Sequence, residues 1–328
     1  MKWLPWFGLA VLIVAAIPVG WFGYTVEVDR TYPRTPTTVI VPDGATGREI
    51  ARLLEERGVI RSAVAFDAMA RLEGRRNDLK AGEFAFPPHQ TAVETLREVE
   101  TGGEQVAVWV TIPEGFTAKE IAQTLAERDL GETGALEAVF LHDSLTFGDA
   151  RTPTLEGYLF PDTYLIPTVA TPAEIAKIMT GQFLSELPRD ASSQAKRLGY
   201  SIPQIVTLAS LVEREAKADD ERALMAGVYY NRLRLGMPLE VDATIEYTFA
   251  HHKDVITYAD LARDSPYNTY KHAGLPPTPI ANPGRASLLA AFHPKKSQFL
   301  FYVYMGNGHH AFSRTLAEHN ANVARYLH

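Results

Sequence analysis

The sequence predicts an α+β protein in which an N-terminal transmembrane helix precedes a small βααβ module and a larger mixed α+β domain. Three observations predict this arrangement. Residues 3–26 carry no charge, a strand–turn–capped-helix unit recurs after them, and two helical patterns follow each other from Ser201 to Met237. We place the transmembrane helix at residues 1–26, a linker at 27–37, the module at 38–112 and the larger domain at 113–328.

Composition excludes several classes of function. The 328-residue chain has a formal net charge of −7 and no block rich in lysine or arginine. It therefore lacks the basic surface that nucleic-acid binding requires. It has no cysteine, which excludes disulfides, thiolate metal sites and a cysteine nucleophile. A cysteine-free chain also fits an oxidising compartment outside the cytoplasm.

The first predicted element is the transmembrane helix. The uncharged stretch from Trp3 to Val26 is about as long as a bilayer-spanning helix, and aromatic residues stand at both of its ends. A cleaved signal peptide is the alternative, but no A-x-A site closes the apolar run, which favours a retained anchor. Lys2 precedes the span, and Glu27 and Asp29 follow it, so we expect the N-terminus inside and the body outside.

The module and the start of the larger domain share an internal repeat. A strand, a proline, an acidic residue–glycine turn and a threonine-capped helix occur twice, as VIVPDGATGREIARLLEERGV and VTIPEGFTAKEIAQTLAERDL. A weaker copy reads FAFPPHQTAVETLREV. A glutamate three residues after each threonine completes a capping box, at Thr46–Glu49, Thr91–Glu94 and Thr117–Glu120. A favoured connection between strand and helix, used repeatedly, explains the repeat equally well.

The stretch from Ser201 to Met237 is predicted to form two consecutive helices. Ser201 and Gln204 form a capping box at the start of the first helix. The second helix is expected to start near Asp219 or Asp220. It ends before Gly236, which suits the left-handed conformation that follows many helices.

Glu213 is the candidate catalytic acid on the first of these helices. Apolar residues recur at helical spacing up to Val212, and Glu213 lies at the edge of that stripe. Partial desolvation of a carboxyl group raises its pKa toward the range that a general acid needs. The same residues are also typical of the exposed end of an ordinary helix, with Glu213 and Lys217 as an i,i+4 pair. Spacing alone does not distinguish Glu213 from Glu215.

Four segments carry a family resemblance. They read LASLVEREA, VYYNRLRLGMPLEVDATIEY, SPYNTYKHAGLPPTPIANPG and FYVYMGNGHHAFSRTLAEHN. In this order and spacing they resemble the membrane-anchored endolytic murein transglycosylases, the YceG-like or MltG family. The stretch from Thr38 to Ile112 resembles a LysM-like module, a small fold that binds N-acetylglucosamine polymers. That resemblance implies carbohydrate binding, and a spacer role fits the stretch equally well.

The family resemblance implies a lyase. Its members cleave the β-1,4 bond between N-acetylmuramic acid and N-acetylglucosamine within nascent peptidoglycan strands, leave 1,6-anhydro ends and so terminate elongation. The implied catalytic position is Glu213, as acid to the leaving oxygen and then as base toward the muramic 6-hydroxyl.

No cofactor is implied. The implied partners are peptidoglycan strands and the membrane, with peptidoglycan synthases as further candidates. The implied location is the cytoplasmic membrane, crossed once, with the catalytic body outside.

The remaining candidate site residues are expected to line a sugar-binding cleft, and each also has a structural interpretation. They are Asn231, Glu240, Asp242, Tyr267, Asn268, Tyr270 and His310. Glu240 stands where the family has glutamine, in LEVDAT instead of a form like LQTDPT, and could add a second acid that permits some hydrolysis. His309 and His310 have no carboxylate or cysteine at ligand spacing, so no metal is expected.

Two other functions are open at this point. A non-catalytic peptidoglycan-binding scaffold would use the module beside an inactive second domain, and retention of Glu213 argues against it. A muramidase-type hydrolase would pair Glu213 with Glu240 or Asp242, as glycosidases with two carboxylates do. A transglycosylase differs because the sugar's own hydroxyl is the attacking group.

Overall fold

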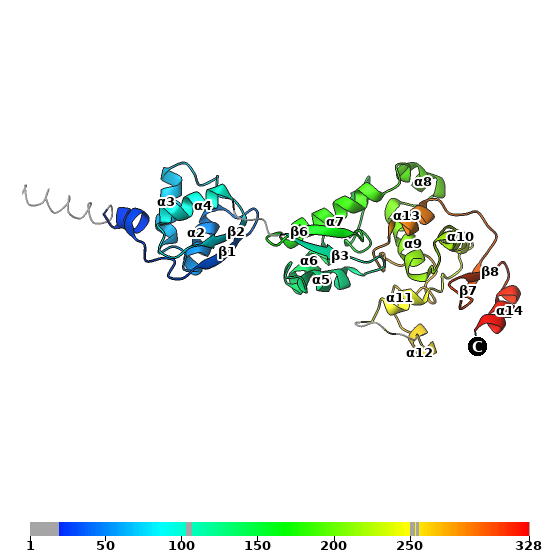
Figure 1. Ribbon diagram of the computed structural model, residues 1–328. Coiled ribbons are helices and arrows are strands. Elements are labelled where there is room, and N and C mark those ends of the chain that lie inside the picture. The colour runs from blue at the N-terminus through cyan, green and yellow to red at the C-terminus, as the bar shows by residue number, and fades with distance from the viewer. Residues whose placement is uncertain (1–19, 103–106, 250–252, 254–255, 328) are drawn as a thin grey trace, which may run out of the picture. The chain divides into compact units, whose positions relative to one another are not determined.

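The computed structural model describes residues 20–102, 107–249, 253 and 256–327 (Figure 1). The chain divides into two compact units, which are described one after the other. The first comprises Met1–Val108 and Leu165–Thr171, and the second comprises Trp109–Tyr164 and Pro172–His328. Both units mix helices and strands, and every sheet in the described ranges has two strands.

The first unit is a small module of three helices and two paired strands. Its elements are β1 (Thr37–Val41), α2 (Gly47–Glu56), α3 (Ala63–Leu72), β2 (Gly82–Phe86) and α4 (Ala92–Thr101). β1 and β2 pair antiparallel, with Val39 opposite Phe84. This confirms the predicted strand–helix–helix–strand order. Capping boxes at Thr46 and Thr91 begin α2 and α4, because each threonine satisfies an amide that the first helical turn leaves unpaired.

The predicted transmembrane helix is wrong for the part of it that the structure describes. Within residues 20–102, 107–249 and 256–327, no helix is long and apolar enough to cross a membrane. The predicted span ends instead in a short π-helix, η1 (Tyr24–Val28), which packs on α3 and α4. Val26 is 3% exposed and belongs to the core of the first unit. An apolar run does not distinguish lipid from a protein core, and here its last residue, Val26, packs against protein. Residues 1–19 of the predicted anchor lie outside the described residues.

The second unit begins with a region of strands and helices, and the first and last of these strands each extend partly into the ranges of the first unit. Its elements are β3 (Ala107–Thr111), α5 (Ala118–Ala126), α6 (Thr133–His142), β4 (Thr146–Phe147), β5 (Ala150–Arg151), β6 (Thr163–Pro167), α7 (Pro172–Glu186) and α8 (Ala191–Leu198). β3 pairs with β6, and β4 with β5. The predicted capping box at Thr117 begins α5, and α5 packs on α6.

A central helix organises the rest of the second unit. It is α9 (Ile202–Glu215), and the helices that follow it are α10 (Asp219–Arg234), α11 (Asp242–Glu246), α12 (Tyr258–Leu261) and α13 (Arg285–Phe292). Helices α8, α10, α11 and α13 all pack on α9 (Figure 1). Every residue from Ile205 to Val212 is therefore buried, whereas the sequence predicted a single buried stripe. The residues of its C-terminal turn, Glu213 to Glu215, are only partly buried.

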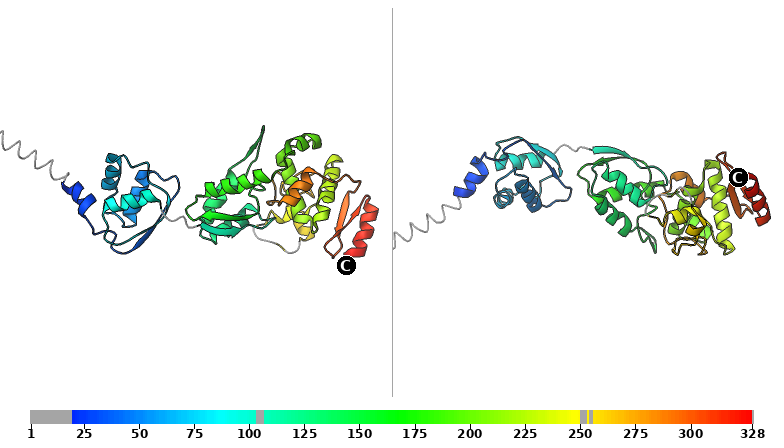
Figure 2. Two further views of the ribbon diagram at one scale, coloured as in Figure 1. Left: turned by 45° about the horizontal axis from the view of Figure 1, so that its top comes forward. Right: turned by 90° about the horizontal axis from the view of Figure 1, so that it is seen from below.

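A β-hairpin and a helix end the chain. β7 (Phe301–Tyr304) pairs antiparallel with β8 (His310–Ser313), and α14 (Leu316–Tyr326) packs on both strands (Figure 2). Alternation in β7 turns the Tyr302 side chain toward α10, where its ring meets that of Tyr229. The hairpin thus brings a residue of the chain's end to the central helices.

Candidate active site

Glu213 lies in the last turn of α9 and is held in an ion pair. Arg222 Nη1 lies 3.2 Å from its Oε1, and the backbone amide of Gly284 donates to its Oε2 at 2.9 Å. The Glu213 side chain is only 6% exposed. Arg222 in turn donates to Ser287 at 2.6 Å and to Asp219 at 2.9 Å. Both carboxylate oxygens therefore have donors, and Glu213 ties α9 to α10 and to the start of α13.

Glu215, two residues further on, has the environment of a proton donor. The Tyr302 hydroxyl donates to its Oε2 at 3.1 Å, and the backbone amide of Ala243 also donates to the carboxylate. Burial raises the pKa of Glu215 to about 7, and the nearby charge of Asp242 acts in the same direction. The hydrogen bond from Tyr302 opposes this rise. A carboxyl group with this pKa is about half protonated at neutral pH, so a proton-donating form is available for general acid catalysis.

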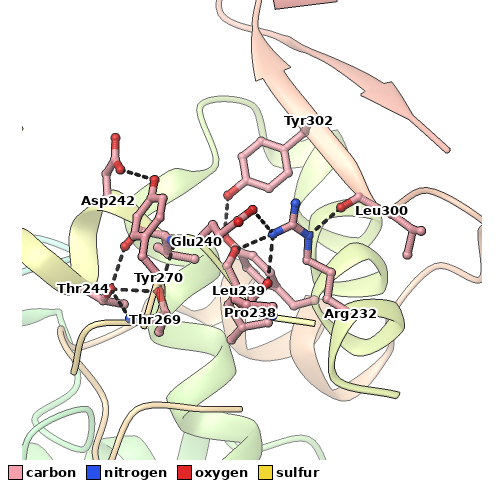
Figure 3. Close-up of polar contacts among 12 residues, drawn as sticks. Arg232, Pro238, Leu239, Glu240, Asp242, Thr244, Thr269, Tyr270, Leu300 and Tyr302 are labelled. Carbon is pink, nitrogen blue, oxygen red and sulfur yellow. Dashed lines mark hydrogen bonds and ion pairs between the residues drawn. The ribbon is translucent and has the colours of Figure 1, made fainter. Parts of the chain in front are cut away.

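Two exposed carboxylates stand beside this group, and each has its own partner (Figure 3). The Tyr270 hydroxyl donates to Asp242 Oδ1 at 2.5 Å. Arg232 Nη1 donates to Glu240 Oε2 at 2.8 Å, although the Glu240 side chain is 46% exposed. The φ angle of Glu240 is +55°, a strained conformation for a residue with a side chain. The solvent-facing side of the site is thus acidic and rich in hydroxyl groups.

Buried contacts fix the segment that carries these carboxylates. Arg232 also donates to the carbonyl oxygens of Pro238 and Leu239, at 3.0 and 3.1 Å. The Thr269 hydroxyl lies 3.0 Å from the Thr244 hydroxyl and accepts from the Val241 amide at 3.0 Å. These bonds join the turn before α11 to the loop of Tyr270, and Figure 3 shows both segments facing Tyr302. Two motifs far apart in the sequence therefore form one site.

The structure brings only some of the predicted site residues together. Asp242 and Tyr270 interact electrostatically with Glu215, and Glu240 interacts in the same way with Tyr270. Asn231 donates to the carbonyl oxygens of Ser297 and Phe299, both at 3.0 Å. Asn268 has no exposed surface, because its amide donates to Leu261 and Arg263 inside the loop. These two asparagines hold backbone segments in place.

The other two predicted residues also make internal contacts. The Tyr267 hydroxyl lies 2.8 Å from that of Thr278, and its ring packs on Tyr247. His310 Nδ1 lies 2.9 Å from Glu221, which His309 also contacts at 3.2 Å. Across the described ranges, no three histidine, aspartate or glutamate side chains are placed to hold a metal ion.

Three important residues were not singled out from the sequence. They are Tyr302, Arg232 and Glu156. The partners of Tyr302 and Glu156 are distant in the chain, whereas Arg232 bonds to residues six to eight positions after it. Glu156 is 1% exposed and accepts from Ala118 N and Asn282 Nδ2 at 3.0 Å and from the Tyr247 hydroxyl at 3.2 Å. Burial raises its pKa to about 7. It anchors the start of α5 to the loop before α13.

The fold and the site define a class of protein: a mixed α/β domain with a protonatable carboxyl group at the end of a buried helix, among hydroxyl-rich side chains. The YceG-like family model matches residues 39–325, so this chain belongs to the YceG-like family. It is 34% identical over 310 residues to the endolytic murein transglycosylase of Bacillus subtilis strain 168, covering 90% of this chain and 86% of that protein.

Two further relatives agree with this membership. The endolytic murein transglycosylase of Streptococcus pneumoniae strain D39 is 30% identical over 348 residues, which cover 94% of this chain and 62% of that longer protein. A 2.6 Å crystal structure of a yceG-like protein from Listeria monocytogenes superposes with a TM-score of 0.59 at 31% identity. That match covers 88% of this chain and 99% of the Listeria chain.

Proposed function

We propose that this protein is an endolytic murein transglycosylase, a lyase that cleaves the β-1,4 bond between N-acetylmuramic acid and N-acetylglucosamine inside a peptidoglycan strand. Membership of the YceG-like family and the names of its relatives support this function. The observation that carries the mechanism is the position of Glu215: half-buried, with its pKa raised to about 7, beside side chains that can bind sugars.

The reaction needs one carboxyl group that acts twice. Protonated Glu215 gives its proton to the glycosidic oxygen as the bond to the anomeric carbon breaks. The resulting carboxylate then takes the proton of the muramic 6-hydroxyl, whose oxygen forms the new bond to the anomeric carbon. The product is a 1,6-anhydro end, and no water is consumed. The substrate's 2-acetamido group can support the developing positive charge, as in substrate-assisted glycosidases.

We propose Glu215 as the acid in preference to Glu213, the position that the family resemblance implied, and the surroundings of the two carboxylates support this choice. Arg222 and the Gly284 amide occupy both oxygens of Glu213 and fix it between three helices. Glu215 instead has two uncharged donors, the Tyr302 hydroxyl and the Ala243 amide, and lies close to the exposed Asp242. We therefore give Glu213 a structural role and Glu215 the proton transfer.

Digestion of purified sacculi by the full-length wild type, Glu215→Gln and Glu213→Gln tests the function and the assignment together. Mass spectrometry separates the outcomes, because a hydrolytic reducing end is one water heavier than an anhydro end. We expect anhydro products from the wild type, a rate about 10² to 10⁴ times lower for Glu215→Gln, and a folded, active Glu213→Gln. Reducing ends would indicate a muramidase, and the absence of any product from the wild type would indicate a scaffold. Loss of activity in Glu213→Gln alone would return the acid role to Glu213.

Three finer expectations remain predictions. Carbohydrate binding by the first unit is supported by a hollow of about 390 Å³ at the turn between β1 and α2, lined partly by Pro42, Asp43 and Leu53. A spacer role for that unit fits as well. Peptidoglycan synthases as partners and a location outside the cytoplasmic membrane follow from the proposed substrate alone.

A further inference from the structure

The second unit contains a cavity of about 660 Å³ that the mechanism above does not use. It lies between α5 and α6 on one side and α9 and α11 on the other. Its lining includes both charged and aromatic side chains. The lining residues are Thr117, Lys119, Glu120, Gln123, Thr133, Glu137, Glu156, Arg214, Ala243, Glu246, Tyr247, Phe249 and Ile280. Its volume falls in the range of about 300–1,000 Å³ that small-ligand pockets occupy.

The cavity adjoins the proposed acid. Ala243, in the first turn of α11, lines the cavity and also donates its backbone amide to Glu215. Arg214, another lining residue, directly precedes Glu215 on α9. The cavity therefore shares Ala243 with the surroundings of Glu215, and its wall includes the residue that precedes Glu215.

Most charged groups of the lining are already satisfied by neighbours. Arg214 pairs with Glu246 at 2.8 Å and donates to the Gly115 carbonyl oxygen at 3.2 Å. Glu120 accepts from the amide and hydroxyl of Thr117, and Glu156 is buried among its three donors. These groups shape the cavity and hold its walls.

Two charged groups of the lining remain for a ligand. Within the part of the chain that the structure describes, neither Lys119 on α5 nor Glu137 on α6 has a hydrogen bond or an ion pair through its side chain. Lys119 is exposed and Glu137 is half-buried. A cation and an anion on adjacent helices fit a molecule that carries both a carboxylate and an amine.

We propose that this cavity binds a short zwitterionic peptide, namely the peptide that murein carries on the lactyl group of its muramic sugar. This inference rests on the proposed function, which places such a sugar beside Glu215. Lys119 would pair with a peptide carboxylate and Glu137 with an amine, while Tyr247 and Phe249 provide apolar surface. The cavity would thus select strands that still carry peptides and would position the muramic residue for cleavage.

Steady-state kinetics on two substrates test the proposal. One is a peptide-bearing glycan strand, and the other is the same strand after an amidase has removed its peptides. We expect Lys119→Ala and Glu137→Gln each to raise KM about three- to tenfold on the peptide-bearing strand, to leave kcat unchanged, and to have no effect on the stripped strand. Lys177→Ala on α7 and Glu55→Gln on α2, both at exposed residues, are matched controls outside the cavity. Equal effects on both strands, or no effect on either, would overturn the proposal.

A second measurement separates this inference from the proposed function. Isothermal titration calorimetry with the peptides that the amidase releases measures binding without any catalysis. We expect the wild type and both controls to bind these peptides, and the two cavity variants to bind about three- to tenfold more weakly. No binding by the wild type would overturn the peptide site even if anhydro products form. Binding without anhydro products would support the site and refute the transglycosylase.

Discussion

Replacing Tyr302 with phenylalanine should move the pH dependence of catalysis in a direction that the site fixes. The substitution removes the hydroxyl that donates to Glu215 Oε2 at 3.1 Å and keeps the ring between its neighbours. This hydrogen bond favours the ionised carboxylate, so its loss raises the pKa of Glu215 further above the present value of about 7. Because the acid must be protonated to act, the alkaline limb of the rate profile should move to higher pH.

The size of this shift follows from the strength of the bond. A hydrogen bond to a charged group contributes about 1.5–3 kcal/mol, and one pKa unit corresponds to about 1.4 kcal/mol. We therefore expect the alkaline limb of kcat to move up by about one to two pH units. The buried Tyr229 hydroxyl, 2.8 Å from that of Tyr302, loses its partner at the same time. This loss should lower stability by about 1–3 kcal/mol.

The assay is the initial rate of anhydro-end formation between pH 5 and 10, measured on peptidoglycan strands for the wild type and Tyr302→Phe. Tyr304→Phe is the matched control on the same strand, because among the described residues the Tyr304 hydroxyl accepts from the Gly308 amide alone. An alkaline limb that stays in place, or that moves to lower pH, would refute the assignment of Glu215 as the acid positioned by Tyr302. A uniform loss of rate at every pH would show a structural role for the hydroxyl.

Three further changes have defined outcomes. Burial raises the pKa of Glu156 to about 7 from its usual 4.5, so the folded state binds this proton more tightly, and stability falls as pH rises through this interval. Glu156→Gln should reduce the difference in the free energy of unfolding between pH 5 and pH 8 by about 3 kcal/mol, as measured by denaturant unfolding. The same difference in the wild type and the variant would contradict the raised pKa of Glu156. Arg222→Ala leaves the carboxylate of Glu213 without its ion-pair partner and should lower the free energy of unfolding by about 3–5 kcal/mol. The control Arg285→Ala breaks an exposed ion pair and should lower it by about 0–1 kcal/mol. Glu240→Gln should still give anhydro ends only; if the wild type forms reducing ends and this variant does not, Glu240 is the source of hydrolysis.

Local features of the fold were predictable because the residues that make them are close in sequence. The capping boxes at Thr46, Thr117 and Ser201 lie where the sequence places them, since a side chain three residues away closes each one. The strand at Gly82–Phe86 and the hairpin of β7 and β8 follow from alternation and turn residues. The left-handed conformation of Gly236, with a φ of +66°, ends α10 in the same local way.

The apolar pattern of the sequence did not show what surrounds each apolar residue in the fold. The end of the apolar run before Glu27 was assigned to lipid, yet Val26 packs in the core of the first unit. On α9 the sequence indicated one buried face, whereas neighbours cover every residue from Ile205 to Val212. Apolar composition predicts burial, but it does not identify what covers the residue.

The sequence by itself determined the family, the two helices from Ser201 to Met237 and the short list of carboxyl groups at the end of the first helix. Only the tertiary structure shows how the surroundings of Glu213 and Glu215 differ. Residues two apart on a helix point about 200° away from each other, so these carboxylates face different neighbours. Glu213 meets Arg222 on the next helix, and Glu215 meets Tyr302 from the end of the chain. A carboxyl group's pKa depends on those spatial neighbours, and sequence spacing does not specify them.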